Sequence, residues 1–345
     1  MPTINKGSDY FGVLTYTGDG AASKTVVDTS AVTFQPDFVW IKGRSGATDH
    51  ALYDAVRGTT KDLVSNSTAA ETTQSTGLTS FVNGGFTIGN LAKLNTSGAT
   101  YTAWCWKANG AGSSNTQGSI TSTVSVNTTA GFSIVTYTGT GANATVGHGL
   151  GVAPRMIIAK RRVDSPYNWP VYHAALSGGA NDYLILDTTN AKATNIVVWN
   201  NTNPTSSVFS IGTDGFINAS TKTYVAYCWA EIAGFSRFTS YTGNGSTDGT
   251  FIFLGFRPKF VLVKRTDTSG TSWVINDTSR DTYNVSSLYL QANVSDAEGT
   301  LNPTMDILSN GFKIRTTNSS WNANGGTYIV AAFAESPFST NNRAR

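Results

Sequence analysis

An internal repeat constrains the fold of this chain more than any other feature of the sequence. The tripeptide Tyr-Thr-Gly occurs three times, beginning at Tyr16, Tyr137 and Tyr241, and each copy ends an apolar stretch. A second glycine follows two residues after the first, and glycine adopts the positive φ angles that tight turns require. Self-similarity with a period of roughly 100 residues predicts three successive copies of one structural unit.

Four further elements recur in the same order within each copy. They are an apolar strand that starts at proline and ends at lysine, a five-residue segment that begins with His or Trp and ends with Asp or His, a Gly-Phe pair between two apolar stretches, and a closing strand. Their first residues in the three copies are Pro36, Pro154 and Pro258; His50, Trp169 and Trp273; Gly85, Gly215 and Gly311; and Tyr101, Tyr224 and Tyr328. Because the order is preserved, we expect the three copies to share one topology, with a hairpin at each Gly-Phe pair.

The composition favours strands and turns over helices. Charged residues make up 13% of the chain and hydrophobic residues 39%, while Ser, Thr, Asn and Gly supply most of the polarity. No stretch shows a sustained helical period. We therefore predict an all-β protein of three tandem antiparallel β-sandwich domains with a jelly-roll-like topology. The expected domains span residues 8–109, 131–234 and 235–338, and a Gly/Ser/Thr-rich linker spans 110–130 with one strand at 119–126.

The closing strand alternates large and small residues. In the first copy Trp104 and Trp106 face one side of the strand, whereas Ala103 and Cys105 face the other, so both faces are predicted to be buried. Cys228 takes the place of Cys105 in the second copy. Because the two cysteines fall in separate domains, we expect two reduced, buried thiols that act as small hydrophobic residues.

The histidines do not suggest catalysis. His50 stands where the other copies have tryptophan, and His173 stands where they have Asp54 and Asp277. A catalytic base would not share its position with a carboxylate in sibling copies, so we expect structural or surface roles for these histidines and for His148. No zinc-protease, nucleophile-elbow or phosphate-loop motif is present.

Paired carboxylates need a separate test, because glycosidases use two acids that flank the scissile bond. Asp54 and Asp62 share the first copy, and Asp277 and Asp281 share the third. An arginine follows three residues after both Asp54 and Asp277, so a local ion pair that fixes a turn is the simpler interpretation. We predict no enzymatic activity, no metal site and no cofactor.

Two tryptophans lie outside the repeated elements, in polar stretches. They are Trp199, followed by Asn200, and Trp321, followed by Asn322. An aromatic ring beside amide groups can stack on a sugar and bond its hydroxyls. These four residues are the candidate ligand-binding residues, although partly buried loop anchors are the alternative interpretation.

The charge pattern argues against nucleic acid as a partner. The net charge is +3, and the densest basic cluster is Lys160, Arg161 and Arg162. A nucleic-acid-binding protein normally carries a larger basic patch, so this cluster is interpreted as a solvated strand end. No apolar run approaches the ~20 residues of a membrane helix, and membrane insertion is not expected.

Several of these segments resemble a repeat found in structural proteins of bacteriophage virions, often described as tail-fibre proteins. The similar segments are FQPDFVWIK at 34–42, YDAVRG at 53–58, GLGVAP at 149–154, GFRPKFVLVKRTD at 255–267, NGFK at 310–313 and AFAESPF at 332–338. The resemblance implies a structural protein on the virion surface, on the tail or the capsid exterior. It brings no catalytic residues.

Three functions are open at this point. The first is a tail fibre or tail-tip adhesin that contacts host surface glycans, and the second is a capsid decoration protein. A glycan-cleaving depolymerase is the third and least favoured. The expected partners are other virion proteins, host glycan and further copies of the chain, with a homotrimer as the most plausible assembly.

Overall fold

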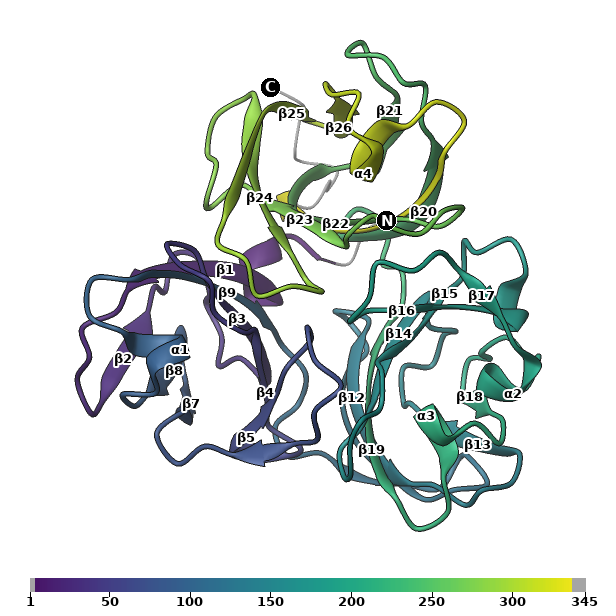
Figure 1. Ribbon diagram of the computed structural model, residues 1–345. Coiled ribbons are helices and arrows are strands. Elements are labelled where there is room, and N and C mark those ends of the chain that lie inside the picture. Colours follow the sequence, from purple (N-terminus) through teal and green to yellow (C-terminus); the bar gives the residue numbers. More distant parts are fainter. Residues whose placement is uncertain (1–3, 337–345) are drawn as a thin grey trace.

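The computed structural model describes residues 4–336 and confirms the all-β prediction. Its strands form antiparallel sheets, and the described helices are single turns. Figure 1 shows three lobes around a common centre, one for each sequence repeat. Each lobe has a main sheet whose inner face points toward the centre, and a smaller group of strands lies behind it.

The first repeat forms the main sheet β1-β9-β3-β4-β5-β6 and the second sheet β2-β8-β7. The bounds of the main-sheet strands are β1 Phe11–Thr17, β9 Thr100–Trp106, β3 Phe38–Gly43, β4 Ala51–Asp54, β5 Gly58–Leu63 and β6 Thr72–Thr73. The remaining elements are η1 Gly7–Asp9, β2 Lys24–Val27, β7 Leu78–Val82, β8 Gly85–Ile88 and α1 Ala92–Asn95.

The second repeat forms the sheet β10-β11-β12-β19-β14-β15-β16-β17 and the pair β13-β18. The strands of the large sheet are β10 Ser113–Asn115, β11 Ser122–Asn127, β12 Phe132–Thr138, β19 Thr223–Trp229, β14 Met156–Arg161, β15 Pro170–His173, β16 Asp182–Ile185 and β17 Ala193–Thr194. The others are β13 Ala144–Gly147, β18 Val208–Ile211, η2 Gly179–Asn181, α2 Ile196–Trp199 and α3 Gly215–Asn218. The expected strand inside 110–130 is present as β11, so this segment extends the sheet of the second repeat.

The third repeat forms one continuous sheet in the order β20-β27-β22-β23-β24-β25-β26-β21. Its strands are β20 Ser236–Thr242, β27 Thr327–Ser336, β22 Arg257–Arg265, β23 Val274–Asp277, β24 Ser286–Gln291, β25 Gly299–Leu308, β26 Gly311–Ile314 and β21 Phe251–Phe253, and its helix is α4 Ser319–Asn322. Its first five strands pair in the same order as those of the other main sheets, counted from β1 and β12. The finer expectation of a jelly roll stays a prediction.

One of the five repeated sequence elements was aligned wrongly. Gly85 and Gly311 begin equivalent strands, but Gly215 begins the helix α3. The equivalent strand of the second repeat is β18, which pairs with β13 as β8 pairs with β2 and β26 with β21. It begins at Val208, where no glycine marks it, and the Gly-Phe pair at 215 is unrelated to the other two.

The closing strands β9, β19 and β27 are buried on both faces, as predicted. Trp104 and Trp106 belong to a central cluster, to which all three repeats contribute, while Ala103 and Cys105 belong to a separate core behind the first sheet. Cys228 lies in the corresponding core of the second repeat, and both cysteines are free and buried. The three repeats therefore share one core through their inner faces and are not independently packed domains.

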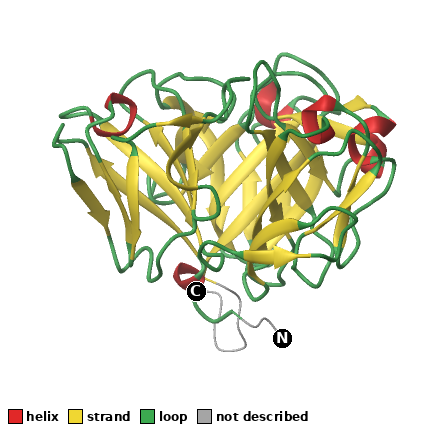
Figure 2. Ribbon diagram, turned by 90° about the horizontal axis from the view of Figure 1, so that it is seen from below, coloured by secondary structure: helices red, strands yellow, loops and turns green. Residues whose placement is uncertain are grey.

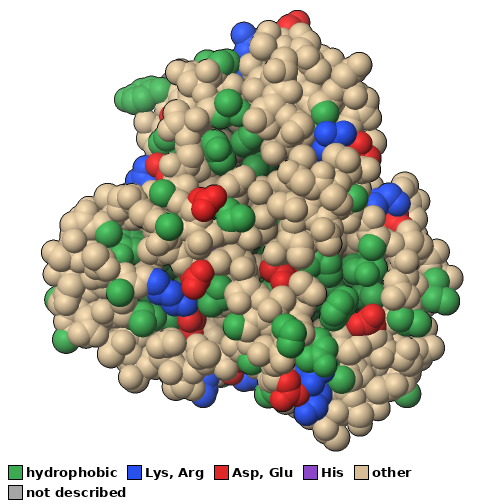
Figure 3. Space-filling view, viewed as in Figure 1, with side chains coloured by type: hydrophobic (Ala, Val, Ile, Leu, Met, Phe, Trp, Pro, Cys, Tyr) green, Lys and Arg blue, Asp and Glu red, His purple; other side chains and the backbone are tan. Residues whose placement is uncertain are grey.

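The two rims of the body differ. Figure 2 shows the strands running between an upper rim, which carries the single-turn α-helices, and a lower rim, which carries η1. Figure 3 shows charged side chains as small groups of both signs among a mostly uncharged surface. No helix in residues 4–336 is long and apolar enough to cross a membrane.

Candidate functional site

Three equivalent aromatic residues meet where the three main sheets converge. Trp106, Trp229 and Phe333 occupy the same register position in their strands, opposite Phe11, Phe132 and Ser236 respectively. The ring centroids of Trp106 lie 5.9 Å from those of Trp229 and 5.6 Å from those of Phe333. These contacts close the chain into a ring in which the third repeat packs against the first.

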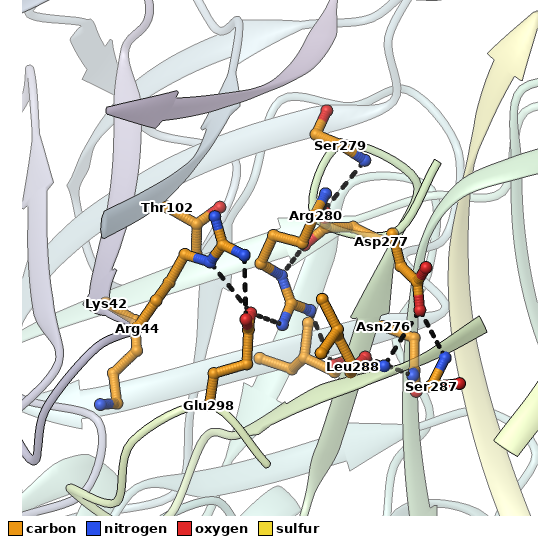
Figure 4. A network of polar contacts seen from close by, with 12 residues as sticks. Lys42, Arg44, Thr102, Asn276, Asp277, Ser279, Arg280, Ser287, Leu288 and Glu298 are labelled. Atoms are coloured by element: carbon orange, nitrogen blue, oxygen red, sulfur yellow. Dashed lines mark hydrogen bonds and ion pairs between the residues drawn. The ribbon is translucent and has the colours of Figure 1, made fainter. Parts of the chain in front are cut away.

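A buried polar network seals the junction between the third and first repeats (Figure 4). Arg280 donates from Nε to Asp277 Oδ2 at 2.6 Å and from Nη1 to Glu298 Oε1 at 2.9 Å. From the first repeat, Arg44 binds both oxygens of Glu298, and Trp104 Nε1 donates to Asp277 Oδ2 at 3.0 Å. Burial acts to raise the pKa of Asp277, but the charge and hydrogen bonds of Arg280 hold it below the ordinary value.

An equivalent network seals the junction between the first and second repeats. Arg57 pairs with Asp54 and donates from Nη1 to Glu71 at 2.9 Å. From the second repeat, Arg162 binds both oxygens of Glu71, and Tyr227 donates its hydroxyl to Asp54 Oδ2 at 2.8 Å. The prediction that an ion pair fixes the turn after Asp54 and after Asp277 is confirmed, and each pair also contacts the neighbouring repeat.

The junction between the second and third repeats lacks this network. The backbone bonds Glu71 N to Arg162 O, Glu298 N to Arg44 O and Lys192 N to Thr266 O are equivalent, so Lys192 replaces the glutamate and Thr266 replaces the arginine. His173 stands in the place of the aspartate, and Leu176 in the place of its arginine. His173 Nε2 contacts the carbonyl oxygen of Val330 at 3.2 Å.

A cavity of about 330 Å³ lies at this third junction. Its walls come from both repeats and consist of Ala175, Leu176, Ser177, Lys192, Ser240, Tyr241, Thr242, Thr266, Thr327, Tyr328 and Ile329. Lys192 donates to Asp182 Oδ2 at 2.6 Å, yet about a third of its side chain stays exposed. A short threonine where the other junctions hold an arginine leaves this space open, and we take the cavity as the candidate site.

A second cyclic set of contacts ties each repeat to the one before it. In each repeat, the first residue of the His/Trp element contacts a backbone carbonyl oxygen of the preceding repeat. The pairs are His50 Nε2 with Gln291 O at 2.9 Å, Trp169 Nε1 with Val64 O at 3.0 Å, and Trp273 Nε1 with Ile185 O at 2.9 Å. The position occupied by His50, Trp169 and Trp273 is therefore a structural contact in every repeat.

The three histidines are fully buried and hydrogen-bonded. His50 Nδ1 accepts from Trp40 Nε1 at 2.8 Å, and His148 and His173 each accept a backbone N–H at Nδ1. Burial lowers the pKa of His50 to about 3 and the pKa values of His148 and His173 to about 4. Neutral imidazoles enclosed in this way fit the structural roles expected from the sequence.

The carboxylates considered for glycan cleavage are held by structural partners. Asp54 and Asp277 are buried in the arginine pairs described above, and Asp62 is buried against Lys93. Asp281 Oδ2 accepts the backbone N–H groups of Ser287 and Leu288. Within residues 4–336, no three His, Cys, Asp or Glu side chains gather as a metal-binding group.

The basic cluster at 160–162 is not a solvated strand end, and that interpretation was wrong. Lys160 is fully buried and donates to the carbonyl oxygen of Tyr167. Burial lowers the pKa of Lys160 to about 8. Arg161 lies over the Tyr167 ring, 3.9 Å from its centroid, and Arg162 belongs to the junction network with Glu71.

The expectation that Trp199 is accessible to a ligand was also wrong. Trp199 is the last residue of the helix α2. Its side chain is 2% exposed and belongs to the core of the second repeat. Asn200 follows as the left-handed residue that ends the helix, with φ of 50°. The Trp199 ring packs edge-on against Tyr172, with 6.0 Å between centroids, and offers no face to a sugar.

Trp321 and Asn322 belong to a repeated element that the sequence did not reveal. They end the helix α4, where α1 has Leu94 and Asn95, and α3 has Ile217 and Asn218. Trp321 is 2% exposed, and Asn322 Nδ2 donates to backbone carbonyls of the two turns beside it. The two residues are structural, and a ligand cannot reach the ring.

The tyrosines of the Tyr-Thr-Gly element and of the closing strand hold these single-turn helices in place. In the third repeat Tyr241 donates to Trp321 O at 2.6 Å and Tyr328 donates to Ser319 O at 2.8 Å, while their rings stack with centroids 4.7 Å apart. Tyr16 with Tyr101 and Tyr137 with Tyr224 repeat this arrangement. The conservation of the element within the chain therefore has a structural cause.

Reasoning from the sequence missed Lys192 and Thr266 as residues of the cavity. The strand around Thr266 gave a signal, because the residue two positions after the lysine of the repeated strand is Arg44 or Arg162 in the other copies and Thr266 in the third. Lys192 gave none, since the three copies do not resemble one another in the stretch that contains it. Its place became clear from the backbone hydrogen bond to Thr266 at 2.9 Å.

The fold and the junctions define an all-β protein of three repeats that close into a ring around a shared aromatic core. The chain belongs to the family described as Domain of unknown function (DUF7483), whose model matches residues 6–337. The family thus spans all three repeats as one unit, which agrees with their shared core. No curated protein matches the sequence.

Proposed function

We propose that this protein is a noncatalytic structural protein of a bacteriophage virion, acting as a tail fibre or tail-tip adhesin that contacts host glycans. The sequence segments that resemble virion proteins support the first part. The observation that carries the second part is the cavity between the second and third repeats. This is the junction at which other residues replace the buried Asp, Glu and Arg network of the other two junctions. A rigid closed scaffold with one open junction suits recognition.

The chemistry of the cavity supports a hydroxyl-rich ligand. Hydroxyl groups of Ser177, Ser240, Thr242 and Thr327 line it together with the Lys192 ammonium group. Such groups donate to and accept from sugar hydroxyls, and a volume of about 330 Å³ lies at the lower end of the roughly 300–1,000 Å³ common for small-ligand sites. We propose a single terminal sugar as the part of the glycan that enters.

A binding role is favoured over glycan cleavage. Cleavage requires one carboxyl group as acid and a second as base or nucleophile on either side of the bond. The cavity lining contains no carboxylate, and Asp182, which lies behind Lys192, already accepts from Lys192, Gly178 and Thr194. This arrangement supports a protein that holds a glycan without cutting it.

Capsid decoration is the second candidate, and the threefold form of the chain favours it. A single chain with three equivalent lobes matches the symmetry of a threefold position on a shell without assembling further copies.

We also propose a homotrimer as the assembly in the tail-fibre case, because three cavities would bind a glycan surface with avidity. Light scattering at micromolar concentration measures the mass in solution, and a monomer would contradict the trimer.

Localisation on the virion tests the proposed function most directly. An antibody against the purified protein, viewed on virions by negative-stain electron microscopy, should label the tail tip or fibres. Labelling of the capsid would favour decoration, and the absence of label on intact virions would contradict a structural role. Purified protein added to host cells should reduce phage adsorption if the protein is the adhesin, whereas release of reducing sugar from host polysaccharide would indicate cleavage.

A further inference from the structure

The edge strand β21 of the third repeat is exposed together with two aromatic side chains. Phe251 is 42% exposed and Phe253 is 60% exposed, while Ile252 between them points into the core. Strand β21 is the last in its sheet and pairs on one side with β26. An uncovered edge with large apolar side chains is a feature that soluble proteins normally avoid, because it invites pairing with another strand.

The backbone groups on this edge are directed outward. Pairing with β26 uses the residues that flank the two phenylalanines, as shown by the bonds from Leu254 N to Asn310 O and from Ile314 N to Thr250 O. In an antiparallel pair, alternate residues direct their N–H and C=O groups away from the partner strand. The peptide groups of Phe251 and Phe253 are therefore the ones that an added strand would meet.

The second repeat shows a segment of the chain that lies along the equivalent sheet edge. In the second repeat the equivalent strand is β13, where Thr145 and Gly147 take the places of Phe251 and Phe253. The segment 119–122 lies along this edge in a parallel direction, with Ile120 bridging to Val146. Ile120 N donates to Thr145 O at 3.0 Å, Thr145 N donates to Ser119 Oγ at 2.8 Å, and Ser122 Oγ donates to Gly147 O at 3.0 Å.

We propose that β21 is a docking site for an extended segment of a partner protein, which adds beside it as the segment 119–122 adds beside β13. The partner segment is hydroxyl-rich and carries one β-branched apolar residue, the equivalent of Ile120, on the core-facing side beside Ile252, while the residues on either side of it lie beside the two phenylalanine rings. Its backbone N–H donates to Phe251 O, and a serine or threonine hydroxyl donates to Phe253 O. This mode of recognition is strand addition to an open sheet edge.

The differences between the repeats favour an external partner at this edge. The first repeat has Thr25 and Val27 at the two positions, and the second has Thr145 and Gly147 under its own covering segment. The third repeat alone places aromatic rings there, and no described segment of the chain covers them. Aromatic residues are enriched where interfaces carry binding energy.

The test uses the full chain and a fluorescent peptide with the sequence of residues 116–126, the segment that covers β13. Fluorescence anisotropy should show saturable binding to the wild-type protein. The variant Phe251→Thr/Phe253→Val, which restores the residues of the first repeat, should bind at least about tenfold more weakly with an unchanged melting temperature, and the control Val27→Thr should bind as the wild type does. A peptide methylated on the backbone nitrogen of its isoleucine should also lose binding, because that N–H is a required donor.

Several results would overturn the proposal. They are the absence of saturable binding, equal binding of the N-methylated peptide, and binding that the double variant leaves intact, which would indicate exchange into β13. A wild-type dimer that the double variant converts to monomer would assign the edge to a second copy of the chain instead. None of these outcomes depends on the glycan-binding proposal.

Discussion

Trp104 of the first repeat donates its indole N–H to Asp277 of the third, at 3.0 Å, in a fully buried contact. Tyr227 of the second repeat makes the equivalent contact to Asp54 of the first, at 2.8 Å. The third such position is Ala331, which has no side-chain donor, and its partner position holds His173. The ring is thus closed by two junctions with buried ion-pair networks and by a third that holds the cavity in place of such a network.

Breaking the junction between the third and first repeats should destabilise the whole chain. Arg280→Leu leaves Asp277 buried without its cation, which costs about 3–5 kcal/mol of unfolding free energy. The double variant Asp277→His/Arg280→Leu installs the residues found at the open junction, and we expect it to be more stable than the single variant. Urea unfolding followed by tryptophan fluorescence measures both, and a double variant that is less stable than Arg280→Leu would contradict the equivalence of the junctions.

Trp321 should behave as a core residue. We expect Trp321→Ala to lower the free energy of unfolding by about 3–5 kcal/mol, as large truncations in a packed core do. Trp321→Ile, which introduces the residue of the second repeat, should cost less because it leaves a smaller cavity. Thermal melting beside Trp104→Ala provides the comparison. A Trp321→Ala protein that melts at the wild-type temperature would contradict the assignment of Trp321 to the core.

Acid should weaken the fold through the buried histidines. Because folding lowers the pKa of His50 from its ordinary 6.5 to about 3, its contribution is complete above pH 6.5 and is lost as the pH falls toward 3. His50→Gln preserves an acceptor for Trp40 and a donor for Gln291. Between pH 7 and 4.5 it should therefore lose less stability than the wild type, by at most about 2–3 kcal/mol. Equal losses in the two proteins, measured by urea unfolding, would exclude His50 as a cause.

Substitutions in the wall of the cavity should weaken ligand binding without preventing folding. Lys192→Ala removes a donor from its wall, and Thr266→Gln extends an amide into the space that arginine fills at the other junctions. Lys192→Ala leaves the buried Asp182 with the Gly178 N–H and the Thr194 hydroxyl as donors, and Thr266→Gln gives up a hydroxyl contact with Thr327. We therefore expect both variants to fold, with the free energy of unfolding lowered by about 1–3 kcal/mol. If the adhesin proposal holds, both should weaken binding to host polysaccharide about tenfold, as measured by biolayer interferometry. Lys222→Ala, at an exposed ion pair with Asp164, is the matched control.

The two thiols should be unreactive in the folded protein. Cys105 and Cys228 are buried in different cores, and burial raises the pKa of both thiols well above the ordinary value. Labelling with a thiol reagent should be slow in native buffer and should reach two thiols per chain in denaturant. Rapid native labelling would contradict the burial, and a mass two units lower than that of the dithiol form would reveal a bridge.

The sequence by itself determined the strand class, the number of repeats and the faces of the closing strand. Alternation of large and small residues fixes which side chains share a face, so the burial of Trp104 on one side and Cys105 on the other could be predicted. The spacing of Asp54 to Arg57 likewise predicted an ion pair, because residues three apart in a turn can reach each other. These are local relationships, and local geometry follows from local sequence.

The tertiary structure decided which residues meet across the repeats, and with them the candidate sites. Polar surroundings suggested that Trp199 and Trp321 are accessible, but burial depends on what packs against a residue from distant parts of the chain. Lys192 faces Thr266 because the ring closes, and Phe251 is exposed because, within residues 4–336, no segment equivalent to 119–122 lies beside β21. Contacts of this kind join residues far apart in sequence, and only the packing of three sheets around one core brings them together.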